Sequence, residues 1–271
     1  MVGQTRRVRR PLDSWAPARR RQAFAVLGVV VLALVTLGTW GAVRATRGTA
    51  AVDQRTLGPV VLVPGYGGDV SDLDPLVVEL RSEGRQAIVF RPSGSEEGDL
   101  RVQARRLATL VRATLRRTGG PSVDLVGYSA GGVVARLFVR DDGGAGLVRR
   151  VLTIGSPHHG TDVAATAKAA VGGCSPACEQ LVPGSDLLAR LDAGDETPAG
   201  PRWITVRSTS DTVVTPTDSA VLAGALNLLV QDFCPSATTS HGALPGDPVT
   251  LATVPAVLGR GSPRPPSGVH C

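Results

Sequence analysis

This sequence of 271 residues is poor in recognisable metal-binding patterns. Cys174 and Cys178 have no second closely spaced cysteine pair to complete a zinc cage, and the only imidazole near a cysteine in sequence is that of His270. Zinc is therefore the minor alternative at the cysteines, and we expect no metal and no cofactor. A single calcium ion on scattered carboxylates is the one metal site that the composition leaves open.

The body of the chain also lacks excess positive charge. The formal net charge is +6, but residues 1–22 alone carry seven arginines against one acid, and Arg44 and Arg47 follow closely. The remainder, residues 48–271, has a net charge of about −2 by the same count of charged side chains. This part of the chain therefore lacks the basic face that nucleic-acid binding requires, and we expect no nucleic-acid partner.

Charge is absent altogether between Ala23 and Val43, a run of small and aliphatic residues. A helix of this length can cross the hydrocarbon core of a bilayer, and the arginines before it would stay on the cytoplasmic side. We therefore expect a single-pass transmembrane helix over 23–43, with the following domain outside the cell. The alternative is a secretory signal segment cleaved near Thr49-Ala50-Ala51. Both interpretations place the domain outside the cytoplasm.

Four cysteines suit an oxidising compartment of this kind. Four thiols allow three pairings, and the sequence does not choose among them. Cys174 and Cys178 are close enough for a local bridge around Pro176, which would leave Cys234 to pair with Cys271.

The rest of the chain has the pattern of one α/β domain without repeats. After the basic tail 1–22, the apolar segment and a linker over 44–56, we expect the domain over 57–261 and a C-terminal tail over 262–271. Short aliphatic runs alternate with amphipathic stretches, which predicts a mostly parallel six-stranded sheet with helices on both faces. The expected strands are 60–63, 87–90, 123–126, 148–154, 203–206 and 226–230.

The pattern breaks between residues 160 and 201, where the sequence is small, polar and rich in Gly and Pro. We interpret this segment as a loop that partly covers a site at the carboxyl ends of the strands, where α/β sheets bind ligands. The alternative is a surface excursion held by a disulfide.

The sharpest local signal is Gly127-Tyr128-Ser129-Ala130-Gly131, between a predicted strand and a predicted helix. Small residues on both sides of a serine permit a strained turn that exposes the hydroxyl. The N–H groups and the positive dipole end of the following helix would face a developing oxyanion. The pattern predicts a nucleophilic serine at Ser129.

A serine hydroxyl needs a base and an acid to become nucleophilic, and in this sheet type they follow it in the order acid, then histidine. His241 lies in the loop before the last helix and fits the base. Asp211, directly after the strand ending at Val206, fits the acid, with Asp218 and Asp232 as rivals. Of the other histidines, we expect His158 and His159 to line the rim of the site or pair with backbone there, and His270 to be solvated.

An oxyanion between these groups would require two N–H donors. The N–H of Ala130 follows the serine, and the N–H of Tyr66 lies in the glycine-rich turn after the first strand.

Five motifs occur in one order: Val63-Pro64-Gly65-Tyr66-Gly67-Gly68, Gly127 to Gly132, Ile154 to Thr161, Ser210 to Val214, and Ser240-His241-Gly242. In this order they resemble the small bacterial triacylglycerol lipases and esterases of the α/β-hydrolase superfamily over about residues 57–260. The resemblance implies hydrolysis of carboxylic esters, often lipid esters, with Ser129, Asp211 and His241 as the catalytic residues and Tyr66 and Ala130 as the oxyanion donors. Pro64 departs from it, since many relatives have histidine there, and so does the apolar segment 23–43.

Two other functions use the same residues. An acyltransferase would pass the acyl group to an envelope lipid or sugar, and a non-catalytic surface protein would keep only the scaffold.

Overall fold

The computed structural model describes residues 22, 26, 29–33, 52–91 and 97–271. The chain divides into two units, Met1–Gly48 and Thr49–Cys271. The described residues of the first unit are helical, and most of the apolar segment 23–43 lies outside the described part. Among the helices that are described, none is long and apolar enough to span a membrane. All further description concerns the second unit.

A six-stranded sheet forms the centre of this unit, so the predicted fold class is confirmed. Its strands follow the predicted runs closely and are all parallel to their neighbours, in the order β2-β1-β3-β4-β5-β6. The strands are β1 (Val60–Val63), β2 (Ala87–Val89), β3 (Val123–Tyr128), β4 (Val148–Ile154), β5 (Arg202–Arg207) and β6 (Leu226–Leu229).

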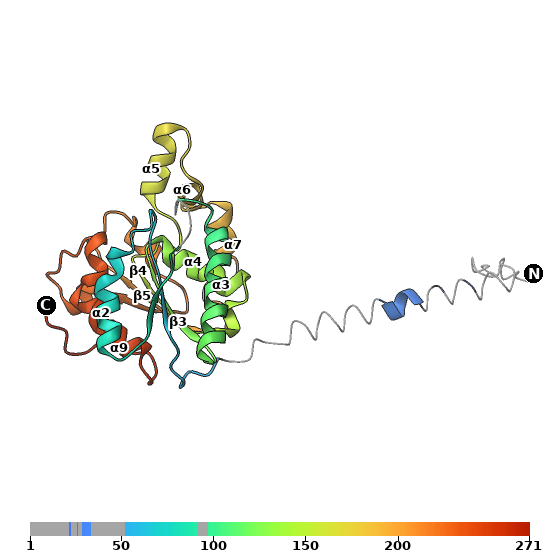
Figure 1. Cartoon of the computed structure of the whole chain (residues 1–271). Helices are drawn as coiled ribbons and strands as arrows, with labels where there is room; N and C mark the ends of the chain where they lie inside the picture. Colours follow the sequence, from blue (N-terminus) through green and yellow to red (C-terminus); the bar gives the residue numbers. More distant parts are fainter. Residues whose placement is uncertain (1–21, 23–25, 27–28, 34–51, 92–96) are drawn as a thin grey trace, which may run out of the picture. The chain divides into compact units, whose positions relative to one another are not determined.

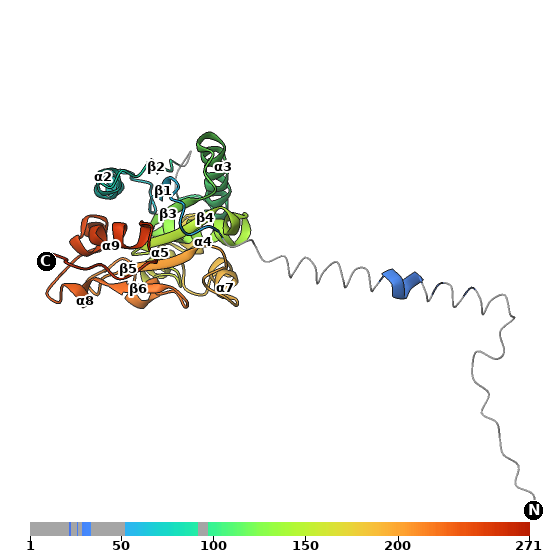
Figure 2. The same cartoon turned by 90° about the horizontal axis from the view of Figure 1, so that it is seen from below.

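Helices cover both faces of this sheet. In Figures 1 and 2, α2 (Asp74–Ser82) and α9 (Pro248–Leu258) lie on one side, and α3 (Leu100–Thr118) and α4 (Ala130–Asp141) lie on the other. Each layer buries its own apolar cluster against the strands. Because helices cover both faces of the sheet, every residue of β1, β3 and β4 is buried, and these strands are mainly aliphatic, with Asp124, Arg149 and Arg150 as buried charged exceptions.

Local signals in the sequence set the helix ends. Asp99 caps α3 by accepting the N–H of Arg101, and Gly119 ends the helix in the left-handed conformation. Asp247 caps α9 in the same way through the N–H of Val249. A short α8 (Val230–Phe233) follows β6, and a 3-10 turn over His241–Gly246 precedes α9.

The segment 160–201 is more regular than the sequence predicts. It contains α5 (Asp162–Val171), α6 (Pro176–Gln180) and α7 (Asp186–Asp192), and α5 and α6 lie together beyond one end of the strands (Figure 1). The description of this segment as a loop is therefore wrong. Alanines make up half of α5, and they favour a helix without giving the apolar periodicity by which helices are recognised.

The register of the sheet brings several chain segments to one edge. Val63 pairs with Gly127, Tyr128 with Ile154, and Ile154 with Val206. The turns that leave β1, β3, β4 and β5 therefore meet at the carboxyl edge, where open α/β sheets bind ligands.

Candidate active site

Ser129 stands at the apex of the turn between β3 and α4. Its backbone has φ 52° and ψ −129°, and it is the only non-glycine residue in the described part of the chain with positive φ. The turn needs its small neighbours: a Cβ on Gly127 would lie 2.5 Å from Cα of Gly132, and one on Gly131 would lie 2.2 Å from the carbonyl oxygen of Val63. The tight backbone turn thus places the Ser129 hydroxyl at the edge of the sheet.

The imidazole of His241 lies between Ser129 and Asp211. Its Nε2 is 3.0 Å from Oγ of Ser129, and its Nδ1 is 2.7 Å from Oδ2 of Asp211. The three residues come from the turn after β3, the segment after β5 and the 3-10 turn before α9. The ring also stacks on Tyr128, with centroids 5.2 Å apart, and the Tyr128 hydroxyl donates to the His241 carbonyl. These contacts hold the ring from two sides.

Asp211 is buried and is held as a carboxylate. Burial by itself raises its pKa, but the hydrogen bond from His241 and the N–H groups of Val214 and Val213 outweigh that effect and lower the pKa below its ordinary value. The N–H groups of Val213 and Val214 lie 2.8 and 2.9 Å from its Oδ1. One carboxylate oxygen is thereby fixed by backbone, and the other is left to face His241.

The two residues expected to donate to an oxyanion flank the serine. Ala130 is the first residue of α4, and an N–H in the first turn of a helix has no carbonyl partner within that helix. Tyr66 lies in the turn after β1, which passes so close that a Cβ on Gly65 would be 3.0 Å from Cβ of Ser129. Both backbones are therefore adjacent to the serine.

An apolar cavity of about 190 Å³ opens beside Ser129. Its walls come from the turns after β1 and β4, from α5 and α6, and from the segment after Asp211; they include Tyr66, Val163, Ala164, Ala167, Cys178 and Val213. Tyr66, Val163 and Val213 are about half exposed, unlike most large apolar side chains of this unit. The cavity could bind an apolar group next to the serine hydroxyl.

His158 lies elsewhere than at the rim of the site, whereas His159 pairs with backbone as expected. The His158 ring is fully buried, with Nε2 3.0 Å from the Thr153 hydroxyl, so its expected position at the rim is wrong. Burial, with the nearby Arg136 charge, holds its pKa well below the ordinary value. His159 does pair with backbone, through Nδ1 and the carbonyl of Ser219.

One group of side chains in the described part could hold a metal ion: His159, Asp192 and Glu196. His159 Nε2 lies 3.2 Å from Oε1 of Glu196 and 3.9 Å from Oδ1 of Asp192. The buried Arg136 guanidinium already lies 2.8 Å from that same Asp192 oxygen. The Asp192 carboxylate therefore already has a cationic partner in Arg136.

The remaining acid and histidine candidates lie outside the site. Asp218 pairs with Arg207 and its side chain is 81% exposed. Asp232 and His270 are also exposed. In the part of the chain that the structure describes, no hydrogen bond connects these three side chains with Ser129.

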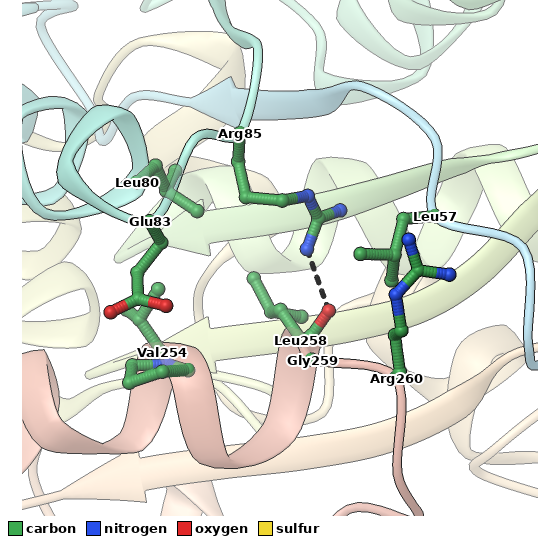
Figure 3. Close-up of a pocket in the computed structure, with 9 residues that line it drawn as sticks. Leu57, Leu80, Glu83, Arg85, Val254, Leu258, Gly259 and Arg260 are labelled. Atoms are coloured by element: carbon green, nitrogen blue, oxygen red, sulfur yellow. Dashed lines mark hydrogen bonds between the residues drawn. The ribbon is translucent and has the colours of Figure 1, made fainter.

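A second cavity, of about 210 Å³, lies at the opposite end of the strands, between α2 and α9 (Figure 3). Arg85 points into it and donates to the carbonyl of Leu258 at 2.6 Å. The same guanidinium lies 2.7 Å from Oδ2 of Asp124. The donors of Arg85 are therefore engaged by the protein itself, which gives this side chain a structural role.

Two disulfides join the four cysteines. Cys174 is bonded to Cys178, and Cys234 is bonded to Cys271. This is the local pairing that the sequence makes plausible. The first bridge lies in the segment over the cavity, and the second ties the C-terminus to the end of α8.

Comparison with known sequences links the central part of the chain to lipases. Residues 96–169 match the family model of the PGAP1-like alpha/beta domain. A triacylglycerol lipase of Pseudarthrobacter phenanthrenivorans is 33% identical over 115 residues, covering 39% of this chain and 35% of that protein. A triacylglycerol lipase of Burkholderia plantarii is equally similar over 39% of this chain and 31% of its own length. The alignments thus span about a third of each relative.

Solved structures share the fold over most of the chain. Aspergillus fumigatus lipase B superposes with a TM-score of 0.69 at 19% identity, covering 81% of this chain and 57% of that one. The mature form of Bacillus licheniformis lipase BlEst2 gives a TM-score of 0.63 at 20% identity, covering 78% of this chain and 95% of that one. At these identities the likeness establishes the fold.

Proposed function

We propose that this chain, an α/β hydrolase related in sequence and fold to lipases and esterases, hydrolyses carboxylic esters with Ser129 as its nucleophile. The observation that carries the proposal is the continuous pair of contacts from the Ser129 hydroxyl through His241 to Asp211, beside an apolar cavity. Serine hydrolases are recognised by this arrangement rather than by sequence position.

In the first step, Oγ of Ser129 attacks the ester carbonyl while Nε2 of His241 takes the hydroxyl proton. Asp211 accepts the Nδ1–H of His241, which fixes the tautomer and stabilises the imidazolium that forms. The lowered pKa of Asp211 supports this role, because a carboxylate that stays ionised can balance the new positive charge.

The tetrahedral intermediate carries its negative charge on the former carbonyl oxygen. The N–H groups of Tyr66 and Ala130 would donate to it, and such donors matter because they are fixed before the charge develops. Collapse of the intermediate breaks the ester bond, and the alcohol leaves with the proton from His241. Water then attacks the acyl-serine with His241 again as base, which releases the acid and restores the Ser129 hydroxyl.

The cavity beside Ser129 supports an acyl group of limited length. A cavity of about 150 Å³ is known to hold benzene, which has six carbons. By that scale a cavity of about 190 Å³ has room for an acyl chain of roughly eight carbons. We infer that the substrates are esters of short and medium-length acids, and that longer chains would extend past the exposed Val163 and Val213.

We also infer that this unit works outside the cytoplasm, since two disulfides support an oxidising compartment. The transmembrane segment over 23–43 stays a prediction from the sequence.

Replacing the nucleophile tests the function. Ser129→Ala should lower kcat for p-nitrophenyl butyrate by about 10⁵- to 10⁶-fold, as in other enzymes whose triad serine is removed. Ser82→Ala, at an exposed serine that donates only to the helix backbone, is the matched control and should keep full activity. Retention of most hydrolysis by Ser129→Ala would exclude Ser129 as the nucleophile.

A further inference from the structure

The turn that carries Tyr66 has little of its own to hold it in place. Three of its residues, Gly65, Gly67 and Gly68, contribute no side chain, and φ is 82° at Gly67 and 72° at Gly68. Glycine gives a backbone its greatest conformational freedom. Yet this turn must keep its Tyr66 N–H directed at the reacting oxygen, so some other contact should restrain it.

The structure provides such a contact from the segment that covers the cavity. The Tyr66 hydroxyl lies 2.9 Å from Oγ of Ser175, which is 109 residues further along the chain. Tyr66 as a residue is 45% exposed, and it forms part of the wall of the cavity beside Ser129. The contact therefore links the expected oxyanion turn to a distant element.

Ser175 is itself fixed by a covalent loop. It lies between the bonded Cys174 and Cys178, and its Oγ accepts the N–H of Cys178 at 3.3 Å, which caps the five-residue helix α6. A helix this short has no stability of its own. The N–H of Ala177 also donates to the carbonyl of Glu97 at 3.0 Å. The disulfide and this bond together hold the hydroxyl of Ser175 where Tyr66 meets it.

We propose that Ser175 is a positioning residue, and that the loop closed by Cys174 and Cys178 uses it to hold the Tyr66 turn over Ser129. The proposal rests on the esterase function proposed above. Removal of the contact leaves the oxyanion donor in place but lets its backbone move. A misplacement of about 1 Å can cost on the order of 100-fold, and loss of a whole donor about 100- to 1,000-fold. Loosening of the turn should therefore lower kcat by about 10-fold.

The first experiment measures kcat and KM of purified full-length variants with p-nitrophenyl butyrate. Ser175→Ala and Tyr66→Phe should each lower kcat by about 10-fold, with KM within about twofold, since the contact acts on the transition state. The double variant should be no worse than either single one, because all three lack the same hydrogen bond. Ser175→Thr, which keeps a hydroxyl, should restore most of kcat.

Ser185→Ala is the matched control. Ser185 caps α7 in the same covering segment, and its Oγ accepts the N–H of Leu188 at the same 3.3 Å, but Tyr66 is not its partner. This variant should lose a similar helix cap and keep its kcat. Unchanged kcat in Ser175→Ala, an equal loss in Ser185→Ala, or additive losses in the double variant would each overturn the proposal.

The two disulfides provide an independent comparison. The Cys174–Cys178 bridge spans a sequence separation of 4, and the Cys234–Cys271 bridge spans 37. The longer loop constrains the unfolded chain more, so Cys234→Ala/Cys271→Ala should lower Tm further while leaving kcat unchanged. Cys174→Ala/Cys178→Ala should lower kcat by about 10-fold with the smaller loss of Tm. If kcat fell in proportion to the loss of Tm in both double variants, the positioning role would be contradicted.

Labelling by a fluorophosphonate probe separates failure of this proposal from failure of the esterase function. If wild-type protein neither hydrolyses the ester nor labels at Ser129, the proposed function itself is wrong. If wild type labels at Ser129 and Ser175→Ala hydrolyses the ester as fast as wild type, the function stands and the positioning role is wrong.

Discussion

At the scale of single residues, backbone N–H groups fix the orientation of the Asp211 carboxylate. Asp211 receives two N–H groups on one oxygen and presents the other to His241. The hydrogen bonds that lower the pKa of Asp211 therefore also fix the direction of its carboxylate. The carboxylate in turn orients the ring of His241 through the contact with Nδ1.

Asp211→Asn should lower kcat by about 10⁴-fold with little change in KM, as the equivalent change does in another Ser-His-Asp enzyme. The asparagine can turn its NH₂ group toward Nδ1 and favour the wrong tautomer of His241. The matched control is Asp218→Asn, which removes an exposed rival carboxylate. Steady-state kinetics on both variants is the measurement, and an equal loss in the two would show that the assignment of the acid is wrong.

His158 makes stability depend on pH. Its pKa is held well below the ordinary value of 6.5 in the folded state. Below pH 6.5 the unfolded chain therefore binds a proton at His158 that the folded chain does not bind. The free energy of unfolding therefore has its full value above pH 6.5. As pH falls below 6.5, it decreases by about 1.4 kcal/mol per pH unit through this group.

Urea unfolding between pH 8 and pH 5 measures this effect. His158→Gln should flatten the acid side of the stability profile by about that slope, because glutamine takes up no proton. Identical slopes in wild type and variant would mean that His158 is not a buried neutral group.

At the scale of elements, the strands could be predicted because the sheet is covered on both faces. Most strands contain a short aliphatic run such as Val60–Val63, since a parallel sheet covered on both faces has no solvent face along which polar residues would alternate. Helix α3 could be predicted from its apolar stripe and its cap at Asp99, and α9 from its apolar composition and its cap at Asp247.

Helices α5, α6 and α7 could not be predicted in the same way. Helix α5 is mostly exposed and contributes only a few side chains to the cavity, so it has no continuous apolar stripe. Helices α6 and α7 begin at serine caps, Ser175 and Ser185, but a serine followed by a short segment is also common in turns and does not by itself indicate a helix. Helices as short as α6 and α7 depend on contacts with the rest of the domain.

Helix α5 should set the length of acyl chain that the site accepts. Ala167 faces the cavity, so Ala167→Trp should fill it and lower kcat/KM for the octanoate ester by at least about 10-fold relative to the acetate ester. Ala169→Trp, on an exposed part of the same helix that does not line the cavity, should leave the ratio unchanged.

A panel of p-nitrophenyl esters of increasing chain length is the measurement for both variants. If Ala167→Trp kept the wild-type preference, acyl chains would bind somewhere other than this cavity.

At the scale of the whole molecule, one end of the sheet carries the candidate active site and the other end carries a buried ion-pair cluster. The carboxyl ends meet at Ser129, whereas the opposite ends are joined by a buried ion-pair cluster. Asp124 lies 2.5 Å from Nη2 of Arg149 and 2.7 Å from Nη2 of Arg85, and Arg149 also donates to the carbonyl of Gly259. Both Asp124 and Arg149 are fully buried. The cluster ties β3 and β4 to the end of α9.

Asp124→Asn should lower the free energy of unfolding by about 3–5 kcal/mol, because it leaves buried guanidinium groups without a counter-charge. The exposed pair of Asp218 and Arg207 is the comparison, and Asp218→Asn should cost less than about 1 kcal/mol. Denaturant titration of both variants distinguishes them, and a loss below about 1 kcal/mol in Asp124→Asn would mean that the cluster is not stabilising.

The chain order of the site could be read from the sequence because parallel strands bring their carboxyl ends to one edge. Ser129, Asp211 and His241 each follow a predicted strand, so their proximity followed from topology. The contact of Tyr66 with Ser175 and the ion pairs of Asp124 could not be read in this way. They join loops and strand ends whose relative positions depend on the packed molecule.

The central claim is that His241 activates the hydroxyl of Ser129. Its most direct test is mass-spectrometric mapping of the residue that a fluorophosphonate probe modifies in the wild-type protein and in His241→Gln. We expect one adduct, on the peptide that contains Ser129, and its near-complete loss in His241→Gln. An adduct on another residue, no adduct on the folded wild-type protein, or equally fast labelling of Ser129 in His241→Gln would contradict the account.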